Sequence, residues 1–267
     1  MRIRDPFLWL AIISGFLVLI FILLPLLKVI VAPSASSLGA ALKDHDVRKA
    51  IGLSVYTSGM AGLISLLLGT PFAYFLARKN FPFKRLVESV IDLPIVVPHP
   101  VVGIAILSVA GKDFWLGRVL AAAGIRIMGS VTGIVVVLTF VGIPFYINAV
   151  KNGFEKIPPR LENVSRSLGA SLPSTLARIT FPLASRSILV GFIMCVARAL
   201  SEFGAVVVVA YHPMIAPVLI YERFEGYGLA YSQPIAVLLI LVCLVIFLIL
   251  RILSSRRPEK ERFQLIH

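Results

Sequence analysis

The sequence has few of the residues from which metal sites and redox centres are built. It contains two cysteines, Cys195 and Cys243, and four histidines. Both cysteines lie inside long apolar runs and lack the short spacing of a redox or metal motif, so we interpret them as small buried apolar side chains. The histidines, at positions 45, 99, 212 and 267, are scattered along the chain. We therefore predict no metal site.

Acidic residues and nucleotide-binding motifs are also scarce. The chain has 13 Asp and Glu against 26 Lys and Arg, for a net charge of +13. The basic residues are spread between apolar runs, which argues against a nucleic-acid-binding patch. The Gly111-Lys112 pair is followed by Asp113, so the phosphate-binding loop G-x4-G-K-[ST] is absent from the sequence. We expect a chain that is not an enzyme and binds no cofactor itself.

Apolar residues, in contrast, are abundant. They make up 58% of the sequence, and the mean hydropathy is +0.96. Several apolar runs reach about twenty residues, the length that a helix needs to cross a bilayer. We predict an all-α integral membrane protein with six transmembrane helices. The expected spans are residues 7–31, 50–77, 86–110, 130–150, 187–210 and 234–253.

The flanking charges predict how these spans are oriented. If the N-terminus is cytoplasmic, seventeen basic residues fall on the cytoplasmic side and eight on the other. This positive-inside bias predicts that both termini are cytoplasmic. The corresponding division of the chain is a first helix with an external connector (1–48), a core of five helices (49–253) that includes a cytoplasmic loop (151–186), and a cytoplasmic tail (254–267).

Two spans have local features of their own. Small residues recur along the second span at Ser54, Ser58, Gly62 and Gly69, a spacing that favours close helix packing in lipid. The third span is interrupted by prolines at positions 94, 98 and 100, and broken membrane helices often line transport pathways. His99 lies in this break, and we favour a packing role for it over a ligand contact.

Charged residues inside the apolar spans require partners. Arg198 and Glu202 lie four residues apart in the fifth span, which would place both on one helix face. Glu88 and Asp92 have the same spacing in the third span, with Arg85 in reach of Glu88. Structural pairing is our first interpretation of both groups. The alternative is that Arg198 and Glu202 form part of a transport pathway or its gate.

The segment 154–184 is the longest stretch between spans that is both basic and amphipathic. Pro158 and Pro159 are suited to the start of a helix, which we expect over residues 161–168. Gly169 is suited to end this helix in a left-handed conformation. We expect a second short helix to begin at Pro173 and to end at Pro182. From spacing alone, the segment could either lie on anionic lipid headgroups or bind a partner.

The residues of this segment resemble the cytoplasmic EAA loop of type I ABC importer permeases, whose pattern is E-A-A-x3-G-x9-I-x-L-P. Gly169, Ile179 and Pro182 have the required spacing, and residues 166–171 read RSLGAS. The resemblance implies that the loop docks on a separate ATPase subunit. The residues that it assigns to this role are Asn163, Val164, Ser165, Arg166, Ser167, Leu168, Gly169, Ala170, Ser171, Ile179, Phe181 and Pro182.

The loop departs from the family pattern at its start and near its end. The E-A-A positions are occupied by Asn163, Val164 and Ser165, and Phe181 replaces the leucine. Glu162 lies one residue before the position of the motif glutamate. The acidic contact that the family makes at that position is therefore not expected from the pattern.

Four further stretches resemble molybdate permeases of the same superfamily. Residues 197–205 read ARALSEFGA, close to the family's ARALGEFGA, with Ser201 in place of glycine. The other stretches are LPIVVPHPVVG (93–103), GTPFAYFLAR (69–78) and TFVGIPF (139–145), and the first has His99 and a displaced proline. The resemblance implies import of molybdate or tungstate, with sulfate or thiosulfate as the alternative. Pathway or gate candidates are Pro98, His99, Arg198, Ser201 and Glu202.

The same resemblance implies a set of partners. These are a second copy of the permease, two ATPase subunits that carry ATP and Mg²⁺, an extracytoplasmic oxyanion-binding protein and the lipid bilayer, with no nucleic acid. An ion-driven secondary transporter would not need the 154–184 segment. An intramembrane serine protease would need a serine and a histidine facing each other, and no serine of this sequence lies in a nucleophile motif.

Overall fold

The computed structural model describes residues 6–111 and 113–255, and all the regular secondary structure in this part of the chain is helical. Most of the predicted tail, residues 256–267, lies outside the described residues. The helices are α1 (Pro6–Val31), α2 (Ala35–Lys43), α3 (His45–Arg78), α4 (Lys84–Val96), α5 (His99–Ala110), α6 (Trp115–Ala122), α7 (Val131–Glu155), α8 (Pro159–Ser167), α9 (Leu172–Thr175), the π-helical turn η1 (Leu176–Thr180), α10 (Phe181–Leu200), α11 (Gly204–Val209), α12 (Ala216–Tyr227) and α13 (Leu229–Ser255).

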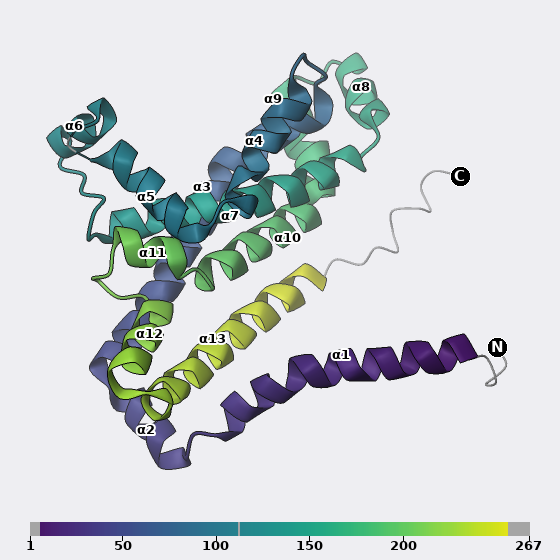
Figure 1. Cartoon of the computed structure of the whole chain (residues 1–267). Coiled ribbons are helices and arrows are strands. Elements are labelled where there is room, and N and C mark those ends of the chain that lie inside the picture. Colours follow the sequence, from purple (N-terminus) through teal and green to yellow (C-terminus); the bar gives the residue numbers. More distant parts are fainter. Residues whose placement is uncertain (1–5, 112, 256–267) are drawn as a thin grey trace.

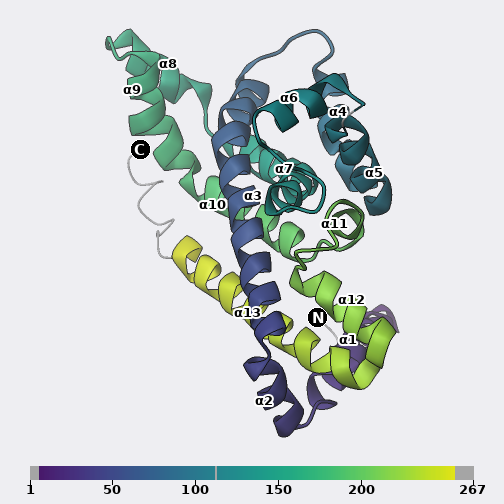
Figure 2. The ribbon, with the colours of Figure 1, turned by 90° about the vertical axis from the view of Figure 1, so that its left-hand side faces the viewer.

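The core of the molecule is built by α3, α7 and α10, which pack along much of their lengths. Figure 1 and Figure 2 show α3 as a spine that runs from α2 at one end to the α8–α9 end at the other. The predicted seam of small residues on α3 is buried in this core. A Cβ atom at Gly69 would lie 2.7 Å from the ring of Tyr146 on α7, so glycine is needed for the close approach of the two helices.

The number of membrane-crossing helices agrees with the prediction of six. Five helical stretches are long and apolar enough to cross a membrane, and the bent pair α4 and α5 makes a sixth candidate. The bend between α4 and α5 is 113° and falls at Val97 and Pro98. Pro98 lies at this bend and cannot donate a backbone hydrogen bond, whereas Pro94 is accommodated inside α4.

The expected fifth span, residues 187–210, is not one helix. The chain leaves the helical path after Leu200, turns through residues 201–203 and continues as the short helix α11. The break lies against the break of the third span, because a Cβ atom at Gly103 of α5 would lie 2.7 Å from the Ala205 carbonyl oxygen of α11. Two interrupted helices therefore meet inside the bundle.

The prediction that Pro182 ends a helix is wrong. The turn η1 precedes α10, and residues 172–200 form one continuous helical stretch that crosses the π-turn. The Phe181 N–H bonds to the Leu176 carbonyl, five residues back. A widened turn gives room to the proline ring, which would otherwise collide with the carbonyl four residues earlier.

The connector that follows the first helix is itself helical. It includes α2 and the first residues of α3, and α12 lies in the segment between α11 and α13. Figure 1 shows α2 and α12 close together at the end of the molecule opposite α8. Arg223 of α12 bonds Asp44 at 3.4 Å, which joins this end of the bundle.

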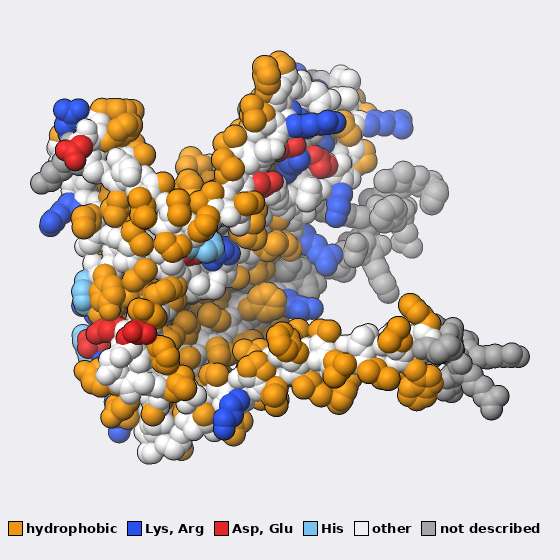
Figure 3. Space-filling model, in the orientation of Figure 1, with side chains coloured by type: hydrophobic (Ala, Val, Ile, Leu, Met, Phe, Trp, Pro, Cys, Tyr) orange, Lys and Arg blue, Asp and Glu red, His pale blue; other side chains and the backbone are white. Residues whose placement is uncertain are grey.

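Helix α1 stands apart from the rest of the bundle. It projects from the α2 end, and its side chains are exposed along its length (Figures 1 and 3). These side chains are almost all apolar, and Phe21 and Val31 are 81% and 76% exposed. An exposed apolar helix of this length needs lipid or another protein surface around it.

Candidate functional site

The residues predicted to bind an ATPase form one helical hairpin at the α8 end of the bundle. We call residues 163–182 the coupling segment. Asn163 to Ser167 lie on α8, which begins at Pro159 as its proline predicts. Gly169 has a φ of +89°, so the predicted left-handed stop is confirmed. Ala170 and Ser171 lead into α9, Ile179 lies in η1, and Phe181 and Pro182 begin α10.

The two arms of the hairpin are held together by side chains. The Ser165 hydroxyl on α8 lies 3.1 Å from the Thr175 hydroxyl on α9. The Ser171 hydroxyl caps α9 by accepting a hydrogen bond from the Ser174 N–H. Arg166 and Ser167 are exposed and available to a partner.

Helix α8 turns its glutamate toward the bundle and its apolar side chains outward. Glu162 is 7% exposed and faces the bundle, whereas Leu161, Val164 and Leu168 are 40%, 49% and 83% exposed. These three apolar residues recur at the spacing of one helix face. They line a hollow of about 720 Å³ whose other walls include Arg160, Ala170 and Ile179. A helix with its apolar side outward presents a surface for a partner.

Glu162 is bonded to two other elements of the bundle, α3 and η1. The carboxylate oxygen Oε1 accepts hydrogen bonds from Arg78 at 3.0 Å (Nε) and 2.8 Å (Nη2) and from the Thr180 hydroxyl at 3.1 Å. The other oxygen, Oε2, accepts one from the Tyr74 hydroxyl at 2.9 Å. Tyr74 also packs edge-on against Phe154 of α7, with ring centroids 5.5 Å apart. We call Glu162, Arg78, Tyr74 and Thr180 the Glu162 cluster.

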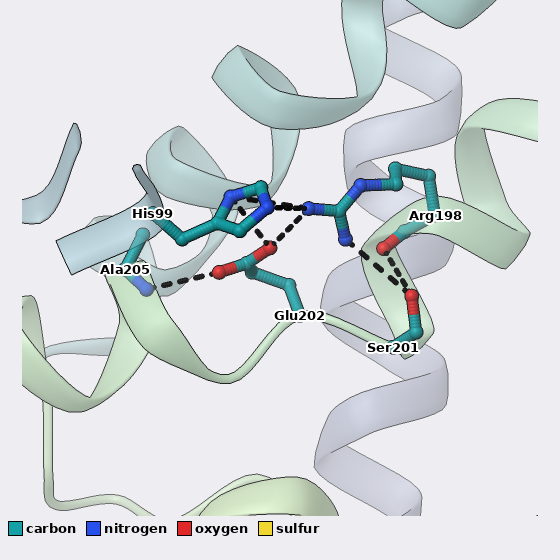
Figure 4. A network of polar contacts seen from close by, with 5 residues as sticks. All are labelled: His99, Arg198, Ser201, Glu202 and Ala205. Atoms are coloured by element: carbon teal, nitrogen blue, oxygen red, sulfur yellow. Dashed lines mark hydrogen bonds and ion pairs between the residues drawn. The ribbon is translucent and has the colours of Figure 1, made fainter. Parts of the chain in front are cut away.

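The pathway candidates lie at the other end of α10, where the two broken helices meet. Figure 4 shows the imidazole of His99 and the guanidinium of Arg198 facing each other above the carboxylate of Glu202. Arg198 Nη2 lies 2.7 Å from Glu202 Oε2 and 2.8 Å from His99 Nε2. Glu202 Oε1 accepts a hydrogen bond from the Ala205 N–H at 2.9 Å. The predicted pairing of Arg198 with Glu202 is confirmed, although Glu202 lies beyond the end of α10.

Exposure differs between the members of this group, which we call the Glu202 cluster (Pro98, His99, Arg198, Ser201 and Glu202). The Glu202 side chain is 1% exposed, whereas those of Arg198 and His99 are 19% and 39% exposed. Ser201 is exposed, and its hydroxyl lies 3.4 Å from Arg198 Nη1. Pro98 positions His99, because it ends the turn from which α5 begins. His99 is thus a half-exposed partner of the Arg198–Glu202 ion pair.

The expected contact between Arg85 and Glu88 is wrong. Glu88 accepts a hydrogen bond from Lys151 Nζ at 2.6 Å, and Asp92 accepts one from the Asn148 amide at 2.7 Å. Both partners lie on α7, across from α4. The acidic face of α4 is therefore used to hold α4 to the core of the bundle.

The Glu162 cluster was missed by sequence reasoning. The family pattern directed attention to position 163, and Glu162 lies one residue earlier. Its partner Arg78 is 84 positions away in the chain and was interpreted only as a topology signal. One signal was present: Glu162 is the acidic residue in a helix whose apolar residues lie on the opposite face.

Comparison with known proteins gives matches that span most of the chain. Residues 69–258 match the family described as "Binding-protein-dependent transport system inner membrane component". The molybdate/tungstate transport system permease proteins of Methanocaldococcus jannaschii and Thermococcus kodakarensis are 40% and 41% identical to it, over 90% and 95% of this chain and 94% and 98% of theirs. A sulfate transport system permease protein of Synechocystis is 31% identical, over 89% of this chain and 85% of that one.

Solved structures with the same fold are more distant in sequence. A chain of a bacterial alginate ABC transporter, solved with a periplasmic protein, superposes with a TM-score of 0.79 at 16% identity, over 95% of both chains. A chain of the MetNI methionine ABC transporter gives 0.63 at 15% identity, over 78% of this chain and 94% of that one. These likenesses support the fold.

Proposed function

The chain belongs to the family of inner membrane components of binding-protein-dependent transport systems, and on this basis we propose that it carries molybdate or tungstate across the membrane. It is a multi-pass protein of the cell membrane and the permease subunit of an ABC importer. We choose molybdate or tungstate as the cargo because this chain is 40–41% identical, over 90–95% of its length, to molybdate/tungstate permeases. The sulfate permease is less similar, at 31%, so sulfate is the second candidate.

We propose that the coupling segment binds a separate ATPase subunit. The apolar outer face of α8 supports this, because Leu168 is 83% exposed beside a hollow that a partner side chain could fill. ATP and Mg²⁺ would be bound by the ATPase. Burial of the three exposed apolar side chains would favour association by a few kcal/mol, at roughly 1.5–3 kcal/mol for each fully buried side chain.

We also propose that the α8 end of the bundle lies in the cytoplasm. Basic residues flank this end on three elements, with Arg78 and Lys79 at the end of α3, Lys84 at the start of α4, and Arg160 on α8. The start of α1 and the end of α13 point to the same side as α8 in Figure 1. Both observations support cytoplasmic termini through the positive-inside rule.

We further propose that two copies of the chain form the membrane part of the importer. The exposed apolar surface of α1 supports this, because α1 has few contacts within its own chain. A closed twofold is also the commonest arrangement of identical subunits. A binding protein would deliver the oxyanion at the opposite end, near α2 and α12. ATP-driven movement of the two copies would then open the path alternately to each side.

The pathway would pass the Glu202 cluster, where two membrane helices are interrupted. Irregular backbone in a membrane is tolerated where it is buried in protein or lines a cavity. The open side of His99 and Arg198 supports contact with the passing anion. Because Glu202 neutralises Arg198, this contact would be weak enough to release the cargo.

The test is reconstitution of the permease in vesicles with its ATPase and binding protein. Uptake of labelled molybdate, tungstate and sulfate is compared with and without ATP. We expect ATP-dependent uptake of molybdate and tungstate, and much less uptake of sulfate. Uptake that follows an ion gradient without ATP would indicate a secondary transporter and overturn the proposal. A preference for sulfate would overturn only the assignment of cargo.

A further inference from the structure

We propose that Glu162 is a positioning residue that fixes the coupling segment to α3 and α10, so that movement of a bound ATPase reaches both membrane helices. This inference rests on the proposed function. It assigns Glu162 to contacts within the chain, facing away from the ATPase.

The Glu162 side chain points into the bundle, away from the apolar face of α8. Glu162 lies on the face of α8 opposite Val164 and Leu168, and its side chain is 9% exposed. A partner bound to the apolar face of α8 would therefore not touch it. The carboxylate points toward the end of α3, where the Arg78 guanidinium gives it two charge-assisted hydrogen bonds.

The hydrogen bonds of Glu162 join α8 to two other elements, α3 and η1. Among the described residues, every side-chain hydrogen bond between α8 and α3 ends on Glu162. The remaining bond goes to Thr180, which is fully buried in η1, directly before α10. One carboxylate thus connects the outer helix of the hairpin with the ends of two core helices.

Helix α10 connects Thr180, a partner of Glu162, with the Glu202 cluster. Helix α10 is 20 residues long, about 30 Å at 1.5 Å per residue. Thr180 precedes its first residue, and Arg198 lies in its last turn. A displacement of η1 would therefore move the helix that carries Arg198. Without the Glu162 bonds, α8 would keep its contact with α9 but lose its side-chain hydrogen bonds to α3, so less of the displacement would reach α3.

The burial of the carboxylate also explains why a different residue cannot easily replace it. A buried carboxylate requires donors for its oxygens, and here four hydrogen bonds come from three side chains. Glutamine has the same shape, but it removes the charge that Arg78 needs and introduces an NH₂ group opposite donors. Aspartate keeps the charge with a shorter reach.

The test uses the complete importer in vesicles, with variants Glu162→Gln and Glu162→Asp. ATPase co-purification, ATP hydrolysis stimulated by loaded binding protein, and anion uptake are measured together. For Glu162→Gln we expect the ATPase to co-purify as in wild type, because the apolar face is intact. Stimulated hydrolysis and uptake should fall roughly tenfold, the order of effect seen for residues that transmit coupling. Glu162→Asp should recover part of this loss.

Glu155→Gln is the matched control. Glu155 is a glutamate at the end of α7 whose side chain is 42% exposed, and its ion pair with Lys151 is long, at 3.8 Å. It should behave as wild type. If Glu162→Gln retains full uptake and stimulation, the positioning role is overturned. If it loses the ATPase during purification, Glu162 acts in partner binding and the inference is also overturned.

A second variant keeps the inference testable if Glu162→Gln does not fold. The double change Tyr74→Phe and Thr180→Val removes two hydrogen bonds from the same carboxylate with little change in volume. We expect a loss of coupling of roughly threefold, and wild-type coupling would overturn the inference. Failure of the proposed function would look different, because the wild-type complex itself would then show no ATP-dependent uptake.

Discussion

Two buried glutamates, Glu162 and Glu202, lie near opposite ends of α10 and differ in how exposed their partners are. Glu162 is held by Thr180, which is fully buried, and by Tyr74 and Arg78, which are partly buried, with the Arg78 side chain 10% exposed. Glu202 is held by Arg198 of its own segment and by His99 across the break, and these two side chains are 19% and 39% exposed. The first cluster is therefore more enclosed than the second, which has an open side.

This difference indicates different roles for two similar ion pairs. A closed cluster with every oxygen bonded favours one arrangement and suits a rigid connection. A cluster with an open cation and an exposed imidazole can exchange a partner with little loss of buried contacts. The Glu162 cluster is therefore suited to transmit movement, and the Glu202 cluster is suited to respond to it.

The largest expected effect comes from removing each carboxylate. Glu162→Ala leaves Arg78, whose side chain is 10% exposed, without its carboxylate partner, and we expect it to destabilise the protein by about 3–5 kcal/mol. Glu202→Ala should cost less, because the Arg198 side chain is 19% exposed and keeps its contact with His99. Thermal unfolding in detergent measures both. The exposed residue Glu225 provides the control, as Glu225→Ala. Equal losses at both sites would contradict the comparison.

The next largest effect is expected on anion uptake when Arg198 is replaced. We expect Arg198→Met to reduce anion uptake roughly tenfold while the ATPase still co-purifies. Methionine is apolar and leaves Glu202 unpaired, so the variant is also combined with Glu202→Gln to relieve the buried charge. Recovery of folding without recovery of uptake would support a pathway role. Arg118→Met, at an exposed site on α6, is the control. Loss of folded protein in the double variant would favour a structural role.

Several features of this fold follow from local sequence and could be predicted. The break in the third span, the place of Pro159 in the first turn of α8 and the left-handed Gly169 each depend on a few neighbouring residues. The pairing of Arg198 with Glu202 also follows from a spacing of four. These predictions are confirmed because nothing distant in the chain competes with the local preference.

Other features depend on how the helices pack, and local reasoning failed there. Pro182 does not end a helix, because the π-turn before it makes room for the ring. Glu88 bonds Lys151, 63 positions away, and not the nearby Arg85. Glu162 likewise depends on Arg78, which reaches it only once α3 and the hairpin lie side by side. Such partners require the tertiary structure.

A smaller effect is expected when one hydrogen bond is removed from the Glu162 cluster. Tyr74→Phe removes the hydrogen bond to Glu162 Oε2 but keeps the ring contact with Phe154. We expect a loss of stability of about 1 kcal/mol, the usual net value of one hydrogen bond, measured by thermal unfolding in detergent. Tyr56→Phe is the matched control, since Tyr56 lies on the same helix and is 58% exposed. An unchanged unfolding midpoint for Tyr74→Phe would show that Glu162 Oε2 does not need this hydrogen bond. The Glu162 cluster would then be less rigid than we infer.

The smallest effect is expected at the open side of the other cluster. His99→Asn removes the imidazole that faces Arg198, but Arg198 keeps its bond to Glu202. Stability should therefore change little, whereas uptake should fall by roughly threefold if the imidazole holds Arg198 toward the passing anion. His45→Asn, at an exposed position at the start of α3, controls for the loss of a histidine. A large drop in unfolding temperature with normal uptake would reverse the assignment, because it would make His99 part of a rigid contact like that of Glu162.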